Sequence, residues 1–144
     1  MTLKRIWVWE IKVIPLEKPF NQDKEKEYPE DIDIDFFVAK HDNHNEFVIT
    51  LNITYKPPRN KEIMIDFISI KVSAEISFPD TLEEEELRSY VPSLCLANLY
   101  GSARGIIAQA TGLFPQGPYF LPVVNIIELL KKKQKKLLKE EKNN

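Results

Sequence analysis

The chain has 144 residues and a mass of 16.8 kDa, a size that indicates one domain with a modest core and excludes a multidomain enzyme. Hydrophobic residues make up 43% and charged residues 29%, so the chain should fold rather than stay disordered. The net charge is −2, but residues 131–144 alone carry +5, which leaves −7 on the first 130 residues. A basic end on an acidic body argues against a nucleic-acid-binding domain, whose basic residues should line a folded face.

Cysteine content and the first residues bear on where the protein works. Cys95 is the only cysteine, so the chain has neither a disulfide framework nor a zinc site built on paired cysteines. The first residues lack the long apolar core of a signal peptide, and no stretch of 18 apolar residues is present to span a bilayer. We therefore expect a cytoplasmic protein without an integral membrane segment.

The first expected strand covers residues 3–14, which are mostly β-branched or aromatic. One parity carries Ile6 and Val8. The other parity carries four apolar residues, namely Trp7, Trp9, Ile11 and Val13. Because both faces are apolar, we expect a partner subunit or a ligand to cover the second face.

Three further strands follow a proline-containing connection at residues 15–30. Residues 31–38 and 47–55 alternate between apolar and polar side chains, and a polar turn at residues 41–45 separates them. A second turn at residues 57–60 precedes a strand over residues 63–78 whose apolar parity changes at Phe67–Ile68, which predicts a bulge. The four strands are expected to form an antiparallel meander.

Helical patterns appear only after residue 80, with a short acidic turn at Glu83–Glu86, a helix over about residues 94–113 and a last helix that begins near residue 126. Strands followed by helices predict an α+β fold, with a four-stranded antiparallel sheet and two C-terminal helices packed on one face. Residues 1–130 are expected to form a single domain. Residues 131–144 then form a lysine-rich helix extension or a flexible tail.

The first long helix has two different faces. Its large apolar side chains suit the sheet, and a ridge of small residues lies on the opposite side. A glycine inside a helix costs about 0.8–1 kcal/mol relative to alanine, so the ridge favours a close helix–helix contact between subunits, with a merely solvent-facing stripe as the alternative. The candidate interface residues are Ala97, Gly101, Gly105, Ala108 and Gly112.

No constellation predicts catalysis, a metal or a cofactor. His41 and His44 lack further ligands, and they are read as turn residues. Cys95 has no paired base, so it is read as a packing residue. The glycines between residues 101 and 105 lack the lysine and hydroxyl of a phosphate loop, and the carboxylates of Glu83–Glu86 point in different directions on a helix. We therefore expect a binding protein rather than an enzyme.

The C-terminal third resembles the SecB-type export chaperones. The resemblance lies in Ala103-Arg104, in Thr111-Gly112-x-Phe114-Pro115 and in Leu121-Pro122-Val123-Val124-Asn125 before the last helix. The chain departs from the family pattern at Thr111, which replaces an arginine, in an extra valine before Asn125, and in Tyr100-Gly101-Ser102. It also ends in lysines instead of the tail that the family uses with its SecA motor, which leaves docking to such a motor open.

The resemblance implies a homotetramer built as a dimer of dimers, in which the first strands help to join sheets and the first long helices pack between dimers. It implies an ATP-independent holdase that keeps unfolded or partly folded polypeptides, including exported ones, in apolar grooves. The client-binding candidates are Trp7, Trp9, Ile11 and Val13. The alternatives are a chaperone dedicated to a single partner and a structural or scaffolding oligomer without general client binding.

Overall fold

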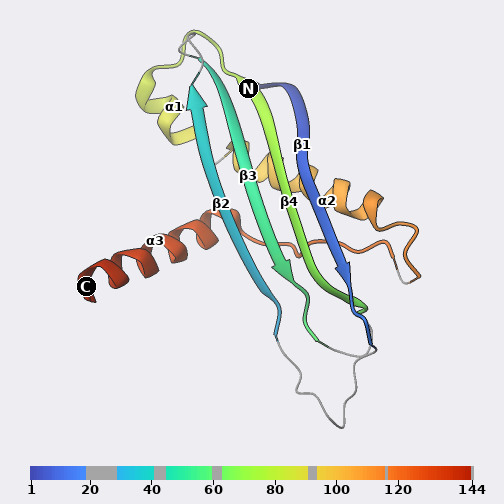
Figure 1. Cartoon of the computed structure of the whole chain (residues 1–144). Coiled ribbons are helices and arrows are strands. Elements are labelled where there is room, and N and C mark those ends of the chain that lie inside the picture. Colours follow the sequence, from blue (N-terminus) through green and yellow to red (C-terminus); the bar gives the residue numbers. More distant parts are fainter. Residues whose placement is uncertain (19–28, 41–44, 60–62, 91–93, 116, 144) are drawn as a thin grey trace.

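The computed structural model describes residues 1–18, 29–40, 45–59, 63–90, 94–115 and 117–143. Four strands come first and three helices follow (Figure 1), which confirms the α+β class. The strands are β1 (Thr2–Pro15), β2 (Asp31–Lys40), β3 (Glu46–Lys56) and β4 (Ile65–Ser77). The helices are α1 (Glu84–Tyr90), α2 (Leu96–Ala110) and α3 (Ile126–Asn143).

The sheet has the strand order β1-β4-β3-β2, and all neighbouring strands are antiparallel. The prediction of a simple meander is therefore wrong for the first strand, because β1 pairs with β4 and not with β2. The connection between β1 and β2 is long enough to allow this, and β4 offers an unbroken apolar row on its core side. Consequently β1 and β2 form the two edges of the sheet.

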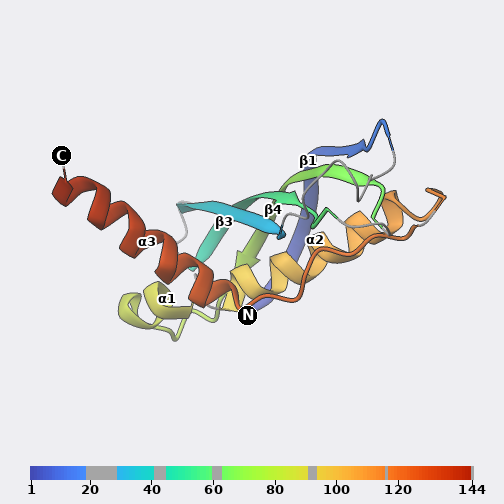
Figure 2. The same cartoon turned by 90° about the horizontal axis from the view of Figure 1, so that it is seen from below.

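The helices lie on one face of the sheet, as predicted (Figure 2). The core lies between this face and α2, and five α2 side chains are buried in it: Leu96, Leu99, Tyr100, Ala103 and Ile107. Odd-numbered residues of β3 and even-numbered residues of β4 supply the sheet side, with Ile49, Leu51, Ile53 and Ile70 wholly buried. The predicted helix end at Leu113 is wrong, since α2 ends at Ala110 and Leu113 is fully exposed.

Hydrogen bonds fasten the segment before α3 to α2. Arg104 donates from Nε to the carbonyl of Leu121 at 2.9 Å, and the Tyr100 hydroxyl donates to the carbonyl of Pro122 at 2.6 Å. The Asn125 side chain accepts the backbone N–H of Glu128 at 3.2 Å, which caps the start of α3. The residues that carried the resemblance therefore hold the connection between the two long helices in place.

Three register shifts interrupt the pairing of β1 with β4. Val8 lies opposite Val72 and Glu10 opposite Lys71, so Trp9 is an extra residue, and a similar shift occurs between Leu3 and Arg5. A third irregularity, between Ile14 and Pro15, falls opposite Asp66 of β4. It lies close to the bulge that the sequence predicted at Phe67–Ile68.

Candidate functional site

The bulge at Trp9 changes which residues of β1 share a face. Trp7 lies opposite Ser73, whose neighbours in β4 face the core, so Trp7 points to the side without helices. Beyond the bulge, Ile11 and Val13 lie opposite the buried Ile70 and Ile68 and point to the helix side. The predicted common face for Trp7, Trp9, Ile11 and Val13 is therefore wrong, because one unpaired residue reverses the alternation.

The side of the sheet without helices, called the outer face here, carries one continuous row across all four strands. The pairing register places Trp7 beside Ser73, Ser73 beside Thr50, and Thr50 beside Phe37. Adjacent strands are about 4.8 Å apart, so the row spans roughly 14 Å between its two aromatic ends. Ser73 and Thr50 form the middle of the row, with exposed fractions of 0% and 6%.

The tryptophans at one end of this row form a rigid cluster. Their rings pack edge to face, with centroids 6.1 Å apart and planes at 71°, a favoured aromatic geometry. The guanidinium carbon of Arg5 lies 4.7 Å from the centre of the Trp7 ring. Trp9 donates from Nε1 to the Ser73 hydroxyl at 2.7 Å, and that hydroxyl shares a second hydrogen bond of 2.7 Å with Thr50. The polar atom of Trp9 is therefore satisfied within the protein, while 61% of the residue remains exposed.

Phe37 ends the row on β2 and is 60% exposed. Sequence reasoning did not select it, although its odd number gives it the same parity as Asp31, Asp33 and Asp35. That parity was the available signal, because the three aspartates already marked the outer face of this strand. The outer face thus presents two large exposed aromatic side chains with a floor of buried hydroxyl groups between them.

The two edges of the sheet differ in how they are covered. At β2, Lys133 of α3 donates from Nζ to the carbonyl of Ile34 and to Asp33 at 3.1 Å each, and it also binds the carboxylate of Asp35. Burial lowers the pKa of Lys133, but its bonds to the two aspartates outweigh this and raise the pKa above its usual value. No described residue pairs with the free side of β1. The β1 edge is therefore available for main-chain pairing, whereas Lys133 occupies one carbonyl of the β2 edge.

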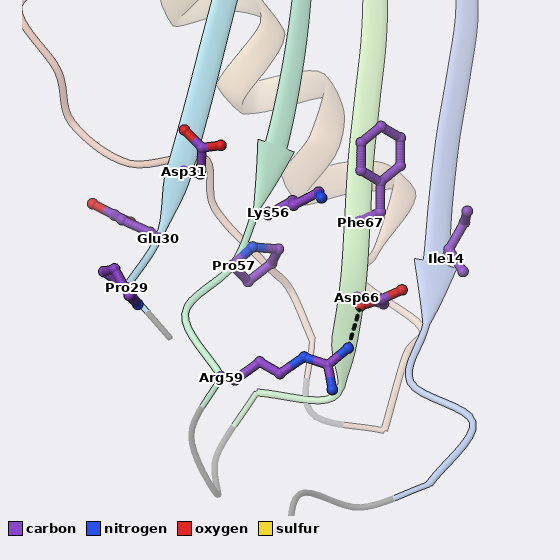
Figure 3. Close-up of a pocket in the computed structure, with 9 residues that line it drawn as sticks. All are labelled: Ile14, Pro29, Glu30, Asp31, Lys56, Pro57, Arg59, Asp66 and Phe67. Atoms are coloured by element: carbon purple, nitrogen blue, oxygen red, sulfur yellow. Dashed lines mark hydrogen bonds and ion pairs between the residues drawn. The ribbon is translucent and has the colours of Figure 1, made fainter. Parts of the chain in front are cut away.

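A cavity of about 970 Å³ opens at the end of the sheet (Figure 3). Three of its charged groups have partners: Arg59 binds Asp66 at 3.0 Å, and Glu30 accepts a hydrogen bond from Tyr55 at 2.7 Å. Asp31 and Lys56 add one charge of each sign. It therefore presents a mixed polar surface rather than a site of one charge. The lining residues are Ile14, Pro29, Glu30, Asp31, Lys56, Pro57, Arg59, Asp66 and Phe67.

A smaller hollow of about 100 Å³ lies between β1 and α2, and Cys95 lines it together with Met1 and Leu3. The Cys95 thiol is wholly buried and donates to the sulfur of Met1 at 3.6 Å. Burial raises the pKa of this thiol to about 11. A thiol in this state is a poor nucleophile at neutral pH, which fits the packing role expected for Cys95.

The small-residue ridge of α2 faces away from the sheet, as the two-faced helix pattern predicted. Gly101 and Gly105 are exposed, and a methyl group added at either position would meet no atom within 4 Å. Ala97 is also exposed and Ala108 is half-buried, whereas Gly112 lies beyond the end of the helix. The role of this ridge as a subunit interface stays a prediction.

His41 and His44 lie outside the described residues. Within the part of the chain that the structure describes, no group of three or more histidine, cysteine or acidic residues is arranged to hold a metal ion. Over the same residues, no helix is both long and apolar enough to cross a membrane.

Comparison with solved structures assigns the fold. The chain superposes on the Mycobacterium tuberculosis SecB-like chaperone Rv1957, solved in complex with a ChAD peptide from the HigA1 antitoxin, with a TM-score of 0.60 over 85% of this chain and 89% of that chain. The fold is SecB-like. The sequence identity is 16%, so the match concerns the SecB-like fold alone.

Sequence comparison adds no family assignment, since no family model and no curated protein matches the chain. A Streptococcus agalactiae protein of unknown function aligns with this chain at a TM-score of 0.40 and 12% identity, over 85% of this chain and 96% of that one.

Proposed function

We propose that the protein is an ATP-independent chaperone that binds unfolded or partly folded polypeptide segments on the outer face of its sheet. The observation that carries this proposal is the exposure of Trp9 and Phe37, at 61% and 60%, on the helix-free face of a SecB-like fold. Apolar side chains of this size on a surface indicate an interaction site. The solved complex of the structural neighbour with an antitoxin peptide supports polypeptide as the class of ligand.

The row on the outer face can bind an extended polypeptide without selecting a particular amino-acid sequence. Aromatic rings contact many kinds of apolar side chain, and the indole of Trp9 keeps its orientation through Ser73. The open edge of β1 adds a second means of holding a client wherever another subunit does not occupy it, because its free N–H and carbonyl groups can pair with an added strand. We assign client contact on the outer face to Trp7, Trp9 and Phe37.

Ile11 and Val13 take a different role in this proposal, because they point to the helix side of the same edge strand. Ile11 is 39% exposed and Val13 is half-buried against the core. A strand added to the β1 edge would place its own alternate side chains beside them. The two residues would therefore contact one side of such a client, and the tryptophans would contact the other side.

The proposed assembly is a homotetramer arranged as a dimer of dimers. Its support in this chain is the exposed ridge of α2, where the open space above Gly101 and Gly105 lets another helix approach the backbone. The proposed location is the cytoplasm, and the clients include polypeptides destined for export. Binding to a SecA-type motor stays open.

Two narrower functions compete with a general holdase. The peptide bound to the structural neighbour comes from a single antitoxin, which favours a chaperone dedicated to one partner. A scaffolding oligomer without client binding would instead cover the outer face with its own subunits. A hydrophobic dye that reports free apolar surface on the assembled protein separates scaffolding from both chaperone roles.

The decisive experiment uses light scattering without ATP to measure two quantities together. These are the mass of the assembled protein and the aggregation of a slowly refolding polypeptide in its presence. We expect the full chain to suppress aggregation and the double variant Trp9→Ala with Phe37→Ala to lose most of this effect. Phe120→Ala is the matched control. Phe120 is also 60% exposed, but it belongs to the connection that joins α2 to α3 and not to a strand of the sheet. Suppression that survives the double variant would overturn the assignment to the outer face, and no suppression by the parent chain with any client would remove the general holdase function.

A further inference from the structure

Helix α3 carries a stripe of basic side chains that neither the fold nor the proposed client site uses. Its members recur at helical spacing, so they share one side of the helix over about 12 Å of its length. All are exposed, and none forms an ion pair with another residue that the structure describes. The stripe consists of Lys131, Lys132, Lys135, Lys136 and Lys139.

The orientation of this lysine stripe is fixed by a sixth lysine. Lys133 points the opposite way and binds Asp33, Asp35 and the carbonyl of Ile34 at the β2 edge. Ile126 near the start of α3 is buried in the core. These two anchors turn the lysine stripe away from the sheet, and the C-terminal half of α3 extends beyond the sheet in both views (Figures 1 and 2).

We propose that the lysine stripe docks the protein peripherally on a membrane surface that contains anionic phospholipid. Five positive charges on one side of a helix, with Glu128 of the first turn as an acidic residue at the same helical spacing, match the charge of such a surface. The acidic body does not oppose this contact strongly, since charges farther away than about 8 Å are screened at physiological ionic strength.

The composition of the stripe favours lipid over the other anionic partners. Protein interfaces are enriched in arginine and aromatic residues and depleted in lysine, whereas laterally mobile lipid headgroups need only point charges. Leu138 is 51% exposed and lines a shallow hollow of about 450 Å³ together with four of the lysines. A bilayer offers apolar contact to this leucine, and a nucleic-acid backbone does not.

The test is co-sedimentation of the full chain with vesicles of phosphatidylcholine alone and with vesicles that also contain about 30% phosphatidylserine. We expect binding only to the anionic vesicles and its loss in high salt. Each lysine near a charged surface adds roughly fivefold to the partition coefficient. The triple variant K132Q, K135Q and K139Q should therefore bind about a hundredfold more weakly.

The matched control is the triple variant K12Q, K56Q and K71Q, which removes the same charge from exposed positions on the sheet. It should bind the anionic vesicles as the parent does, and circular dichroism should show unchanged helix content in both variants. Equal weakening by the two variants, equal binding to neutral vesicles, or no binding to anionic vesicles would each overturn the proposal. So would tighter binding, at the same salt, to polyglutamate or to duplex RNA than to the vesicles.

Discussion

Trp9 donates its indole N–H to the buried hydroxyl of Ser73, 2.7 Å away on the neighbouring strand. Trp9 is the extra residue of a bulge and has no opposite partner in the ladder, so this side-chain bond determines where its ring lies. The same hydroxyl is bonded to Thr50. One buried serine thus links the exposed tryptophan to the middle of the sheet.

Removing that hydroxyl should affect both stability and the tryptophan cluster. For Ser73→Ala we expect the free energy of unfolding to fall by about 1–2 kcal/mol, because the buried Thr50 hydroxyl loses its partner. The environment of Trp9 should change at the same time. Urea unfolding followed by tryptophan fluorescence measures both effects. Ser69→Ala is the control, since Ser69 lies on the same face of β4 and its side chain forms no hydrogen bond with another residue that the structure describes. Equal losses in the two variants would contradict the role given to Ser73.

Lys133 should affect the position of α3 beside β2 more strongly than it affects the free energy of unfolding. Its aspartate partners have side chains that are 60% and 65% exposed, so solvent screens the pairs and we expect Lys133→Ala to cost no more than about 1 kcal/mol. Hydrogen exchange should nevertheless become faster in the first half of α3, because the link to the β2 edge is lost. Lys132→Ala keeps that link and should leave exchange unchanged, since alanine does not lower helix propensity. Faster exchange there as well would show that the loss of a positive charge on α3, and not the contact with β2, is responsible.

Cys95 should be unreactive in the folded protein. Its pKa of about 11 lies two units above the ordinary value of 9.0, so the thiolate fraction at pH 8 is about a hundredfold lower than for a free thiol. Alkylation should be slower by at least that factor in the native chain than in urea. The native rate should rise with pH until the thiol titrates near pH 11. Rapid native labelling at pH 8 would contradict both the burial and the raised pKa.

Substitutions on the α2 ridge can distinguish an effect on helix stability from an effect on subunit assembly. Since an added methyl group meets nothing at Gly105, Gly105→Ala should stabilise the helix by up to about 1 kcal/mol in a single chain. Gly105→Leu should lower the mass of the oligomer in light scattering if the ridge packs against another subunit. Ala110→Leu, at the exposed last residue of α2, serves as the size control. An unchanged mass in Gly105→Leu would place the subunit interface elsewhere.

Local patterns in the sequence were enough to predict the strands, the helices and the two-faced character of α2. Alternation and helical periodicity depend only on residues a few positions apart, so they can be read without knowing which elements pair. The aspartates of β2 likewise marked its outer face, and Phe37 at the same parity belonged to that face. The residues before α3 carried a recognisable pattern because they fix the connection between α2 and α3.

Contacts between distant segments decided the rest. The pairing of β1 with β4 and the bulge at Trp9 depend on residues more than 60 positions apart, such as Trp9 and Ser73. The anchor between Lys133 and Asp33 joins residues 100 positions apart, and together with the buried Ile126 it turns the other lysines of α3 outward. Composition and periodicity therefore defined what each element is, whereas only the packed sheet determined which aromatic side chains share a face, because register is a property of two strands together.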